Sequence, residues 1–178
     1  DERGHGENKR VACTYGQKEI RGLLAVIDDT KARYGNIRLG IHGESLGGAT
    51  VLYSYAYLKD GVLRFVVDDC GFSSILPVIL DAAKSNHIPV FFVYLAAIAT
   101  KFMYGAGLYE AVPEKKVRNA KNNTPLLIIH GGADDFIKPW HSERIYDAAS
   151  CYKKLHFIEG AAHAGSAIHN PGEYRRIL

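Results

Sequence analysis

Ser45 lies in the segment G-x-S-x-G at residues 43–47, between an apolar run and a run with helical character. This context predicts a sharp turn from a strand into a helix, in which the serine is held in a strained conformation with its hydroxyl exposed. The helix directs the positive end of its dipole at this turn, and the N–H of Leu46 is placed to donate to an oxyanion. The pattern favours Ser45 as a nucleophile for acyl transfer, and a glycine-rich turn with an incidental serine is the alternative.

A serine hydroxyl needs a base to take its proton and a carboxylate to orient that base. Asp134 and Asp135 follow residues 125–129, a continuous apolar run that is typical of a strand buried on both faces. A residue that follows a parallel strand lies at the carboxyl edge of the sheet, where open α/β sheets keep their sites. The pattern alone leaves the choice between the two aspartates open, because one of them can cap the following turn.

Among the histidines, His163 has the position expected of the general base. It follows residues 154–158, which are typical of another strand, and so it is expected at the same sheet edge as Ser45. The other histidines fit different environments: structural hydrogen bonds at strand ends for His42 and His130, a strand interior for His156, the surface for His141 and His169, and a helical insert for His87. A serine, a carboxylate and a histidine therefore each follow or end a predicted strand.

Helical and strand patterns alternate along the chain. Apolar residues at helical spacing predict a helix over 17–34, and further helices are expected over 46–58, over 142–149 and from Pro171 onward. Strands are expected over 37–42, 62–67, 125–129 and 154–158, and the segment 73–123 has a mostly helical pattern rich in aromatic residues. This alternation predicts an α/β fold with a mostly parallel sheet and flanking helices, in one domain over 1–178.

The composition excludes several classes of partner. With 178 residues, 47% of them hydrophobic, and a net charge of +3, the chain suits one soluble globular domain with no nucleic-acid partner. The apolar run at 88–100 is shorter than the roughly 20 residues that span a bilayer. The histidines lack metal-ligand spacing, so neither a metal nor another cofactor is expected.

The cysteines Cys13, Cys70 and Cys151 are few, odd in number and far apart. This usage favours free thiols in a reducing compartment, and hence the cytoplasm, over a disulfide framework. Cys70 follows a predicted strand near the expected site, and we interpret it as a buried thiol without a role in the chemistry.

Four motifs together resemble the α/β-hydrolase-fold serine hydrolases, and most closely the bacterial esterase and acyl-peptidase-like members. They are D-x-R-G-H-G at 1–6, G-x-S-x-G-G at 43–48, H-G-x-x-D-x-x-V at 130–137, with isoleucine replacing the valine, and G-x-x-H at 160–163. The resemblance implies a hydrolase that cleaves small carboxylic esters, or amides, through an acyl-enzyme. The roles that it implies are nucleophile for Ser45, acid for Asp134, base for His163 and oxyanion donor for Leu46.

The resemblance has two further implications. It places residues 73–123 at the position of a helical lid, whose aromatic residues either line an acyl pocket or pack in the core. It also implies that the turn at 1–6, with His5, is structural and that strands and a second oxyanion donor precede it. We therefore expect an N-terminally incomplete domain with an open edge at 37–42, and anchoring to a membrane through a preceding segment stays open.

Other functions remain to be distinguished from an esterase. A peptidase or an acyltransferase would use the same three residues. A non-catalytic interaction domain on a hydrolase scaffold is the alternative from a different class. A dehalogenase with an aspartate nucleophile is disfavoured because position 45 is serine.

Overall fold

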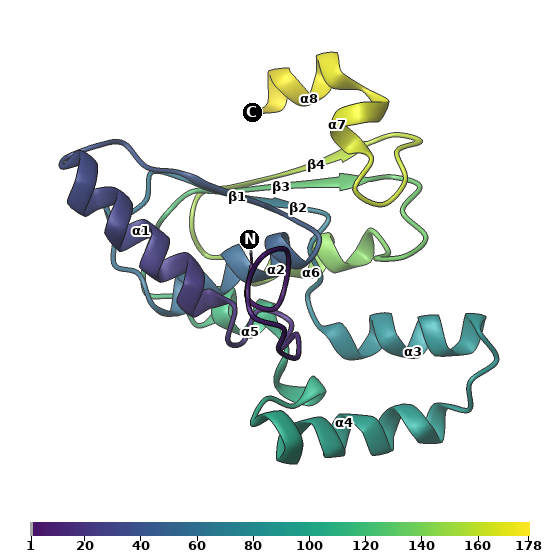
Figure 1. The fold of residues 1–178 in the computed structure, drawn as a ribbon. Coiled ribbons are helices and arrows are strands. Elements are labelled where there is room, and N and C mark those ends of the chain that lie inside the picture. Colours follow the sequence, from purple (N-terminus) through teal and green to yellow (C-terminus); the bar gives the residue numbers. More distant parts are fainter. Residues whose placement is uncertain (1) are drawn as a thin grey trace.

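The computed structural model describes residues 2–178, so Asp1 of the first motif lies outside the described residues. Four parallel strands form one sheet in the order β1-β2-β3-β4 (Figure 1). Their bounds are Ile41–Glu44 for β1, Val66–Asp69 for β2, Leu126–Gly131 for β3 and Lys153–Ile158 for β4. The predicted α/β class is confirmed, because adjacent parallel strands need helical crossovers to connect them.

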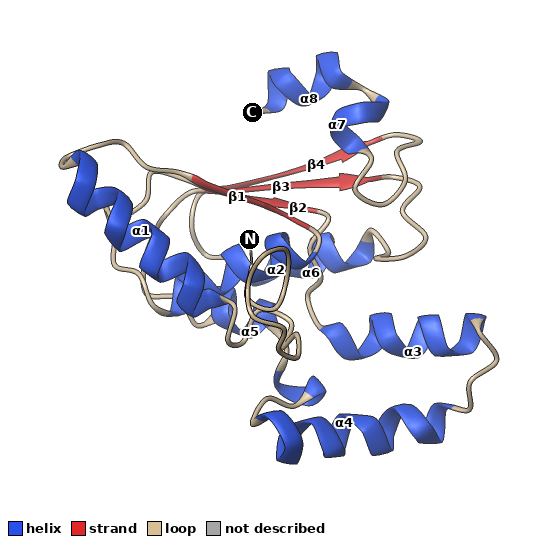
Figure 2. Ribbon diagram, in the orientation of Figure 1, coloured by secondary structure: helices blue, strands red, loops and turns tan. Residues whose placement is uncertain are grey.

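Helices cover both faces of this sheet (Figure 2). The crossovers place α2, α5 and α6 on one face, with α1 against α2, and α7 and α8 follow β4 on the other face. The bounds are Ile20–Tyr34 for α1, Leu46–Tyr53 for α2, Pro113–Arg118 for α5, Trp140–Ala148 for α6, Ser166–His169 for α7 and Pro171–Ile177 for α8. The last helix begins as predicted, since the Asn170 side chain accepts a hydrogen bond from the N–H of Glu173 and proline follows at the first helical position.

Side chains alternate between the two faces of the strands and form two separate cores. Val66 and Ile128 pack with Leu52 of α2 on one face, whereas Val67 and Ile129 pack with Tyr174 of α8 on the other. The strands β2 and β3 are therefore buried on both faces, and this explains why their sequences are continuously apolar rather than alternating.

The segment between β2 and β3 forms a hairpin of two helices that projects away from the sheet (Figure 1). Its helices are α3 at Ile75–Ser85 and α4 at Val90–Tyr104, followed by the short 3₁₀ turn η2 at Leu108–Glu110. The hairpin joins the rest of the molecule through a third core, in which Ile75 and Ala97 pack with Ile137 and Phe72. Helix α5 belongs instead to the layer that covers the sheet.

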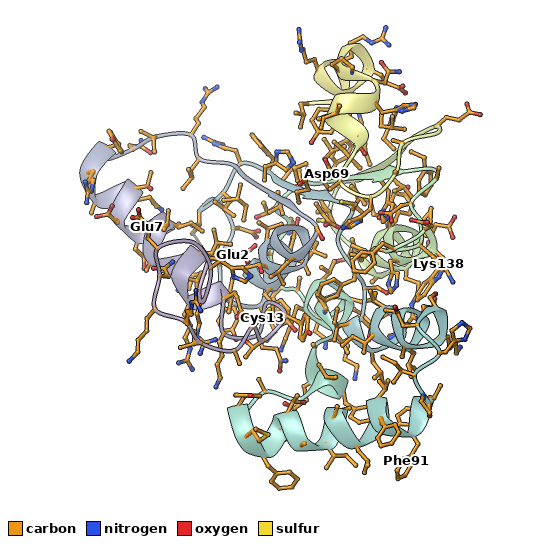
Figure 3. All side chains as sticks on the ribbon, turned by 45° about the vertical axis from the view of Figure 1, so that its right-hand side comes forward. Glu2, Glu7, Cys13, Asp69, Phe91 and Lys138 are labelled. Atoms are coloured by element: carbon orange, nitrogen blue, oxygen red, sulfur yellow. The ribbon has the colours of Figure 1, made fainter. Side chains whose placement is uncertain are left out.

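The outer side of α4 carries large apolar residues that are exposed. Phe102 is 84% exposed, and Phe91 points away from the molecule (Figure 3). Within residues 2–178, no single helix is long and apolar enough to cross a membrane. The bent pair Val90–Tyr104 and Leu108–Arg118, at 90° to one another, passes that test by length and composition alone.

Three predicted boundaries are wrong by four residues or more. The strand expected over 62–67 begins only at Val66 and runs to Asp69, because its ladder with β3 starts where Val66 pairs with Leu126. The strand expected from residue 37 begins only at Ile41, because the parallel ladder with β2 pairs Ile41 with Val66 and a strand needs a hydrogen-bonded neighbour. The helix expected to reach residue 58 ends at Tyr53 and continues only as the 3₁₀ turn η1 at Ser54–Ala56.

Candidate active site

Ser45 occupies the junction between β1 and α2 in a strained backbone conformation. Its φ is +54° and its ψ is −112°, a region that residues other than glycine rarely adopt. The N–H of Ser45 donates to the carbonyl of Asp69 at 2.8 Å, which ties the turn to the end of β2. The strain and this anchor present the serine side chain at the carboxyl edge of the sheet, as the sequence predicts.

The glycines around Ser45 are not equally necessary. A Cβ at Gly43 would overlap the backbone of Gly47, and a Cβ at Gly48 would overlap the carboxylate of Asp68. At Gly47 itself, a Cβ would meet only open space and one distant carboxylate oxygen. The close packing of the turn against its own helix and against Asp68 therefore requires glycine at positions 43 and 48. The G-x-S-x-G pattern instead contains glycine at positions 43 and 47.

Ser45, His163 and Asp134 form one chain of hydrogen bonds. The Oγ of Ser45 lies 2.9 Å from Nε2 of His163, and Nδ1 of His163 lies 2.7 Å from Oδ2 of Asp134. The serine ends β1, the aspartate follows β3 and the histidine follows β4, so three strand ends supply the three groups. The neighbouring Asp135 is exposed, and the geometry selects Asp134.

The surroundings of Asp134 keep its carboxylate ionised. Burial raises the pKa of Asp134, but hydrogen bonds from His130, from His163 and from the N–H of Ile137 outweigh it and hold the pKa well below its ordinary value. Its Oδ1 accepts from the N–H groups of Phe136 at 3.0 Å and Ile137 at 2.9 Å. The loop after β3 therefore fixes one carboxylate oxygen and leaves the other for His163.

The His163 ring lies at the boundary between protein and solvent. Its side chain is 21% exposed, while that of Asp134 is buried. The ring of Phe136 meets it edge-on, with 5.0 Å between centroids. A small molecule can therefore reach Ser45 and His163 but not Asp134.

Leu46 is the first residue of α2, and its N–H belongs to the first turn, where a helix has no internal acceptors for its donors. Together with the helix dipole, this donor provides an environment for negative charge beside Ser45. The position agrees with the oxyanion role expected for Leu46.

A group of buried polar residues under the serine turn was not assigned a role from the sequence. Asp68 accepts from the N–H of Gly71 at 3.1 Å, and burial raises the pKa of its carboxyl to about 7. The Tyr174 hydroxyl donates to Oδ2 of Asp69 at 2.6 Å and lies 3.1 Å from Nε2 of His42. The sequence signal was the pair of aspartates that ends an apolar strand.

The N-terminal turn is held by a buried carboxylate that the sequence analysis also missed. Glu19 accepts from the Thr14 hydroxyl at 2.6 Å and from the N–H of Gly16 at 3.0 Å, and its Oε1 lies 3.6 Å from the guanidinium of Arg3. His5 is exposed, and its Nδ1 lies 3.1 Å from the carbonyl oxygen of Arg3. These contacts hold the turn together, and its structural role stays a prediction.

One prediction about the histidines is wrong. His141 was expected at the surface, but it is 2% exposed, and its Nδ1 accepts from the N–H of Ser73 at 3.1 Å. Its ring stacks on Trp140, with 3.7 Å between centroids. The helix expected over 142–149 begins two residues earlier, at Trp140, so His141 lies in its first turn on the buried side.

Three side chains at the site lie close enough together to be considered as ligands of a metal ion. The ligand atoms of Cys70, Asp134 and His163 lie within 4.8 Å of one another. Burial, and then the charge of Asp69, raise the pKa of the Cys70 thiol, and a protonated thiol is a poor metal ligand. Because the other two groups are hydrogen-bonded to each other, the arrangement fits proton transfer better than metal binding.

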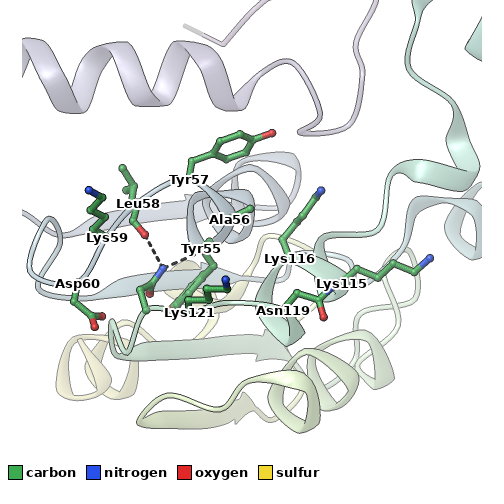
Figure 4. Close-up of a pocket in the computed structure, with 11 residues that line it drawn as sticks. Tyr55, Ala56, Tyr57, Leu58, Lys59, Asp60, Lys115, Lys116, Asn119 and Lys121 are labelled. Carbon is green, nitrogen blue, oxygen red and sulfur yellow. Dashed lines mark hydrogen bonds between the residues drawn. The ribbon is translucent and has the colours of Figure 1, made fainter.

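A large surface hollow among the described residues lies elsewhere. Its volume is about 880 Å³, and it is lined by residues 55–60 with Lys115, Lys116, Asn119, Lys121 and Asn122 (Figure 4). These residues precede β2 and β3, whereas Ser45 and its partners follow the strands. The hollow is therefore at the amino edge of the sheet, away from the candidate site.

Comparisons with known proteins agree with this fold. Residues 1–177 match the model of the prolyl oligopeptidase family. The uncharacterized protein YqkD of Bacillus subtilis is 31% identical over 182 residues, which cover 100% of this chain and 59% of YqkD. The uncharacterized protein YfhR of Escherichia coli K12 is 30% identical over 188 residues, which cover 99% of this chain and 56% of YfhR. The chain thus spans somewhat more than half the length of these relatives.

Solved structures show the same architecture. The Pyrococcus furiosus esterase Pf2001 superposes with a TM-score of 0.72 at 20% identity, over 99% of this chain and 65% of the esterase. A lipase-esterase related protein from Clostridium acetobutylicum has a TM-score of 0.68 at 15% identity, over 100% of this chain and 82% of its own. The acylaminoacyl peptidase of Pyrococcus horikoshii has a TM-score of 0.63 at 17% identity, over 90% of this chain and 26% of the peptidase. These likenesses show that the chain has the α/β-hydrolase fold, and the family match shows that it belongs to the prolyl oligopeptidase family.

Proposed function

We propose that this chain is a serine hydrolase that cleaves carboxylic esters of small molecules through an acyl-enzyme. The observation that carries the proposal is the hydrogen-bonded chain from Ser45 through His163 to Asp134, with distances of 2.9 and 2.7 Å. A strained serine at the start of a helix, next to an imidazole that a buried carboxylate orients, is the arrangement that activates a hydroxyl for acyl transfer.

In the first half of the reaction, Nε2 of His163 takes the proton from Oγ of Ser45 while that oxygen attacks the ester carbonyl. The N–H of Leu46 donates to the oxyanion of the tetrahedral intermediate. The protonated imidazole then gives its proton to the leaving alcohol, and the acyl group stays on Ser45. Asp134 remains ionised throughout and stabilises the imidazolium.

In the second half, water replaces the alcohol. His163 takes a proton from the water, the resulting hydroxide attacks the acyl carbonyl, and Ser45 recovers its proton as the carboxylic acid leaves. The same steps cleave an amide when His163 protonates an amine leaving group. The structural neighbours include an esterase and an acylaminoacyl peptidase, and we favour the ester because it presents the better leaving group.

We further propose that the α3–α4 hairpin acts as a lid over the site. Its core packs against Phe72 and Ile137, which lie in the loops that follow β2 and β3. The hairpin is therefore attached at the same sheet edge as Ser45.

Nitrophenyl esters of increasing acyl length test this role. Shortening α4 should change the acyl chain length that the protein prefers, and an unchanged preference contradicts the lid proposal.

A fluorophosphonate probe tests the hydrolase proposal, because it reacts only with an activated serine. We expect covalent labelling of the full-length protein, retention of labelling in Ser150→Ala, which changes an exposed serine, and loss of labelling in Ser45→Ala. A well-folded wild-type protein that is not labelled overturns the proposal and favours the non-catalytic interaction domain.

A further inference from the structure

We propose that His130 is a positioning residue for the reaction, which holds the Asp134 carboxylate at Oδ2, the oxygen that His163 also contacts. The inference rests on the proposed serine hydrolase function. His130 ends β3 in the sheet, four residues before Asp134, and it is 0% exposed. It therefore cannot contact a substrate and can act only through its neighbours.

The ring of His130 uses both nitrogens for hydrogen bonds. Nε2 lies 2.7 Å from the carbonyl oxygen of Ile137 and 3.3 Å from Oδ2 of Asp134, so its N–H is shared between these two acceptors. Nδ1 lies 2.6 Å from the hydroxyl of Ser142 on α6. With the proton on Nε2, Nδ1 accepts a hydrogen bond from Ser142, and the ring is fixed at both ends.

These contacts close the loop that carries the acid. The N–H of Ile137 donates to Oδ1 of Asp134 at 2.9 Å, and the carbonyl of the same residue accepts from His130. The carboxylate is thus held on Oδ1 by the loop and on Oδ2 by two imidazoles. A catalytic group must keep its geometry within a fraction of an ångström. The network therefore holds Oδ2 in the position that accepts the hydrogen bond from Nδ1 of His163 before substrate binds.

The electrostatic surroundings of His130 also affect the acid. The ionisable groups around it are Asp134 on its own loop, Asp68 and Asp69 on β2 and His141 on α6, and β4 contributes the ring of Phe157 at 6.5 Å. Burial lowers the pKa of His130, but the hydrogen bonds to Asp134 and to the Ile137 carbonyl outweigh burial and raise it. A proton on His130 therefore places a positive charge beside Asp134 as the pH falls.

That charge has a defined consequence for the base. Across Asp134, a positive charge on His130 opposes the positive charge that His163 acquires in the reaction, and a neutral side chain at position 130 removes this opposition. The acidic limb of the kcat/KM profile should consequently lie at lower pH in the wild type than in His130→Gln.

Three variants of the full-length protein separate positioning from a merely structural role. His130→Gln keeps an N–H donor near Nε2 but cannot take up a proton, and His130→Phe keeps a ring without either hydrogen bond. His141→Gln is the matched control, because His141 is also buried and lies on α6, but it bonds Ser73 rather than Asp134.

We expect His130→Phe to lower kcat roughly 10- to 100-fold with little change in KM, since it loosens a group that supports the transition state. His130→Gln should recover most of kcat and move the acidic limb to higher pH. His141→Gln should leave the acidic limb where it is in the wild type. Wild-type kcat and pH profile in a folded His130→Phe protein overturn the inference.

A second readout does not depend on turnover. The hydrogen-bonded Nδ1 proton of His163 gives a low-field NMR resonance that reports its contact with Asp134. We expect this resonance in the wild type and in His130→Gln, and its broadening or displacement in His130→Phe. If His130→Phe does not fold, the pH profile of His130→Gln tests the inference instead. An acidic limb at the wild-type position would then overturn it. An absence of fluorophosphonate labelling in the wild type overturns the proposed function alone, whereas an unchanged resonance in folded His130→Phe overturns the role of His130.

Discussion

At the scale of single residues, the candidate site depends on which carboxyl groups carry charge. Asp134 is held ionised by four hydrogen-bond donors, while burial raises the pKa of Asp68, one strand away, and favours its neutral form. Two buried aspartates of the same type thus have opposite electrostatic properties. The difference follows from the number of donors that each carboxyl meets.

Asp134→Asn should leave the fold intact and lower kcat roughly 10⁴-fold, because an amide next to Nδ1 of His163 favours the wrong imidazole tautomer. Asp135→Asn is the matched control one residue away, and we expect it to retain activity because its side chain is exposed. Steady-state hydrolysis of a nitrophenyl ester measures both variants. Equal losses in the two variants would remove Asp134 from the proposed acid role.

Asp68→Asn should change how stability depends on pH. The folded-state pKa of about 7 exceeds the roughly 3.9 of an unfolded aspartate, so the folded wild type binds more protons between these values. Its contribution to the free energy of unfolding is therefore present below about pH 4 and lost as the pH rises to about 7. Urea denaturation from pH 4 to 8 should show the wild type losing stability relative to the variant. Parallel curves would mean that Asp68 ionises normally in the fold.

At the scale of elements, the junction between β1 and α2 determines the position of the serine. The helix begins directly after the strand, with Ser45 in the strained turn and Gly48 packed against Asp68. The turn leaves no room for a side chain at Gly43 or Gly48, and the carbonyl of Asp69 accepts a hydrogen bond from the N–H of Ser45. The strain at Ser45 persists because the packing around it is close on both sides.

Gly43→Ala should destabilise the protein by about 3 kcal/mol or more, because the new methyl group would overlap the backbone of Gly47. Gly47→Ala is the matched control: it adds the same methyl group in open space and should change stability by less than about 1 kcal/mol. Thermal unfolding compares the two. A tolerated Gly43→Ala would show that the turn can open without cost.

At the scale of the whole molecule, the β1 edge of the sheet, like the β4 edge, has no strand partner among the described residues. β1 pairs only with β2, and alternate N–H groups of a strand point to opposite sides. Since the N–H groups of Ile41 and Ser45 donate toward β2, those of His42 and Glu44 point to the free side. The apolar outer side of α4 is a second surface that this chain leaves exposed.

Amide hydrogen exchange should distinguish the two sides of β1. In the 178-residue chain alone, we expect the amides of His42 and Glu44 to exchange much faster than that of Ile41, because they lack a carbonyl acceptor. Ser45 provides an internal reference for the protected side. Slow exchange at His42 and Glu44 would show that another segment or a second copy of the chain covers this edge.

The sequence by itself determined the class of the fold and the placement of the three candidate groups. Alternating apolar periodicities predicted strands and helices in the observed order, and the strand ends located Ser45, Asp134 and His163 at one edge of the sheet. These features depend on residues close together in the chain, so local patterns are sufficient to predict them.

Only the tertiary structure decided which groups meet. Contacts across 118 residues, between Ser45 and His163, and across 29 residues, between His163 and Asp134, selected one aspartate of an adjacent pair. The same packing buried His141 and placed His130 against the acid. Local periodicity gives the direction of a side chain relative to its own element, whereas burial and hydrogen-bond partners depend on how separate elements pack. For that reason the position of each candidate group at the sheet edge could be predicted from the sequence, but the contacts between the groups could not.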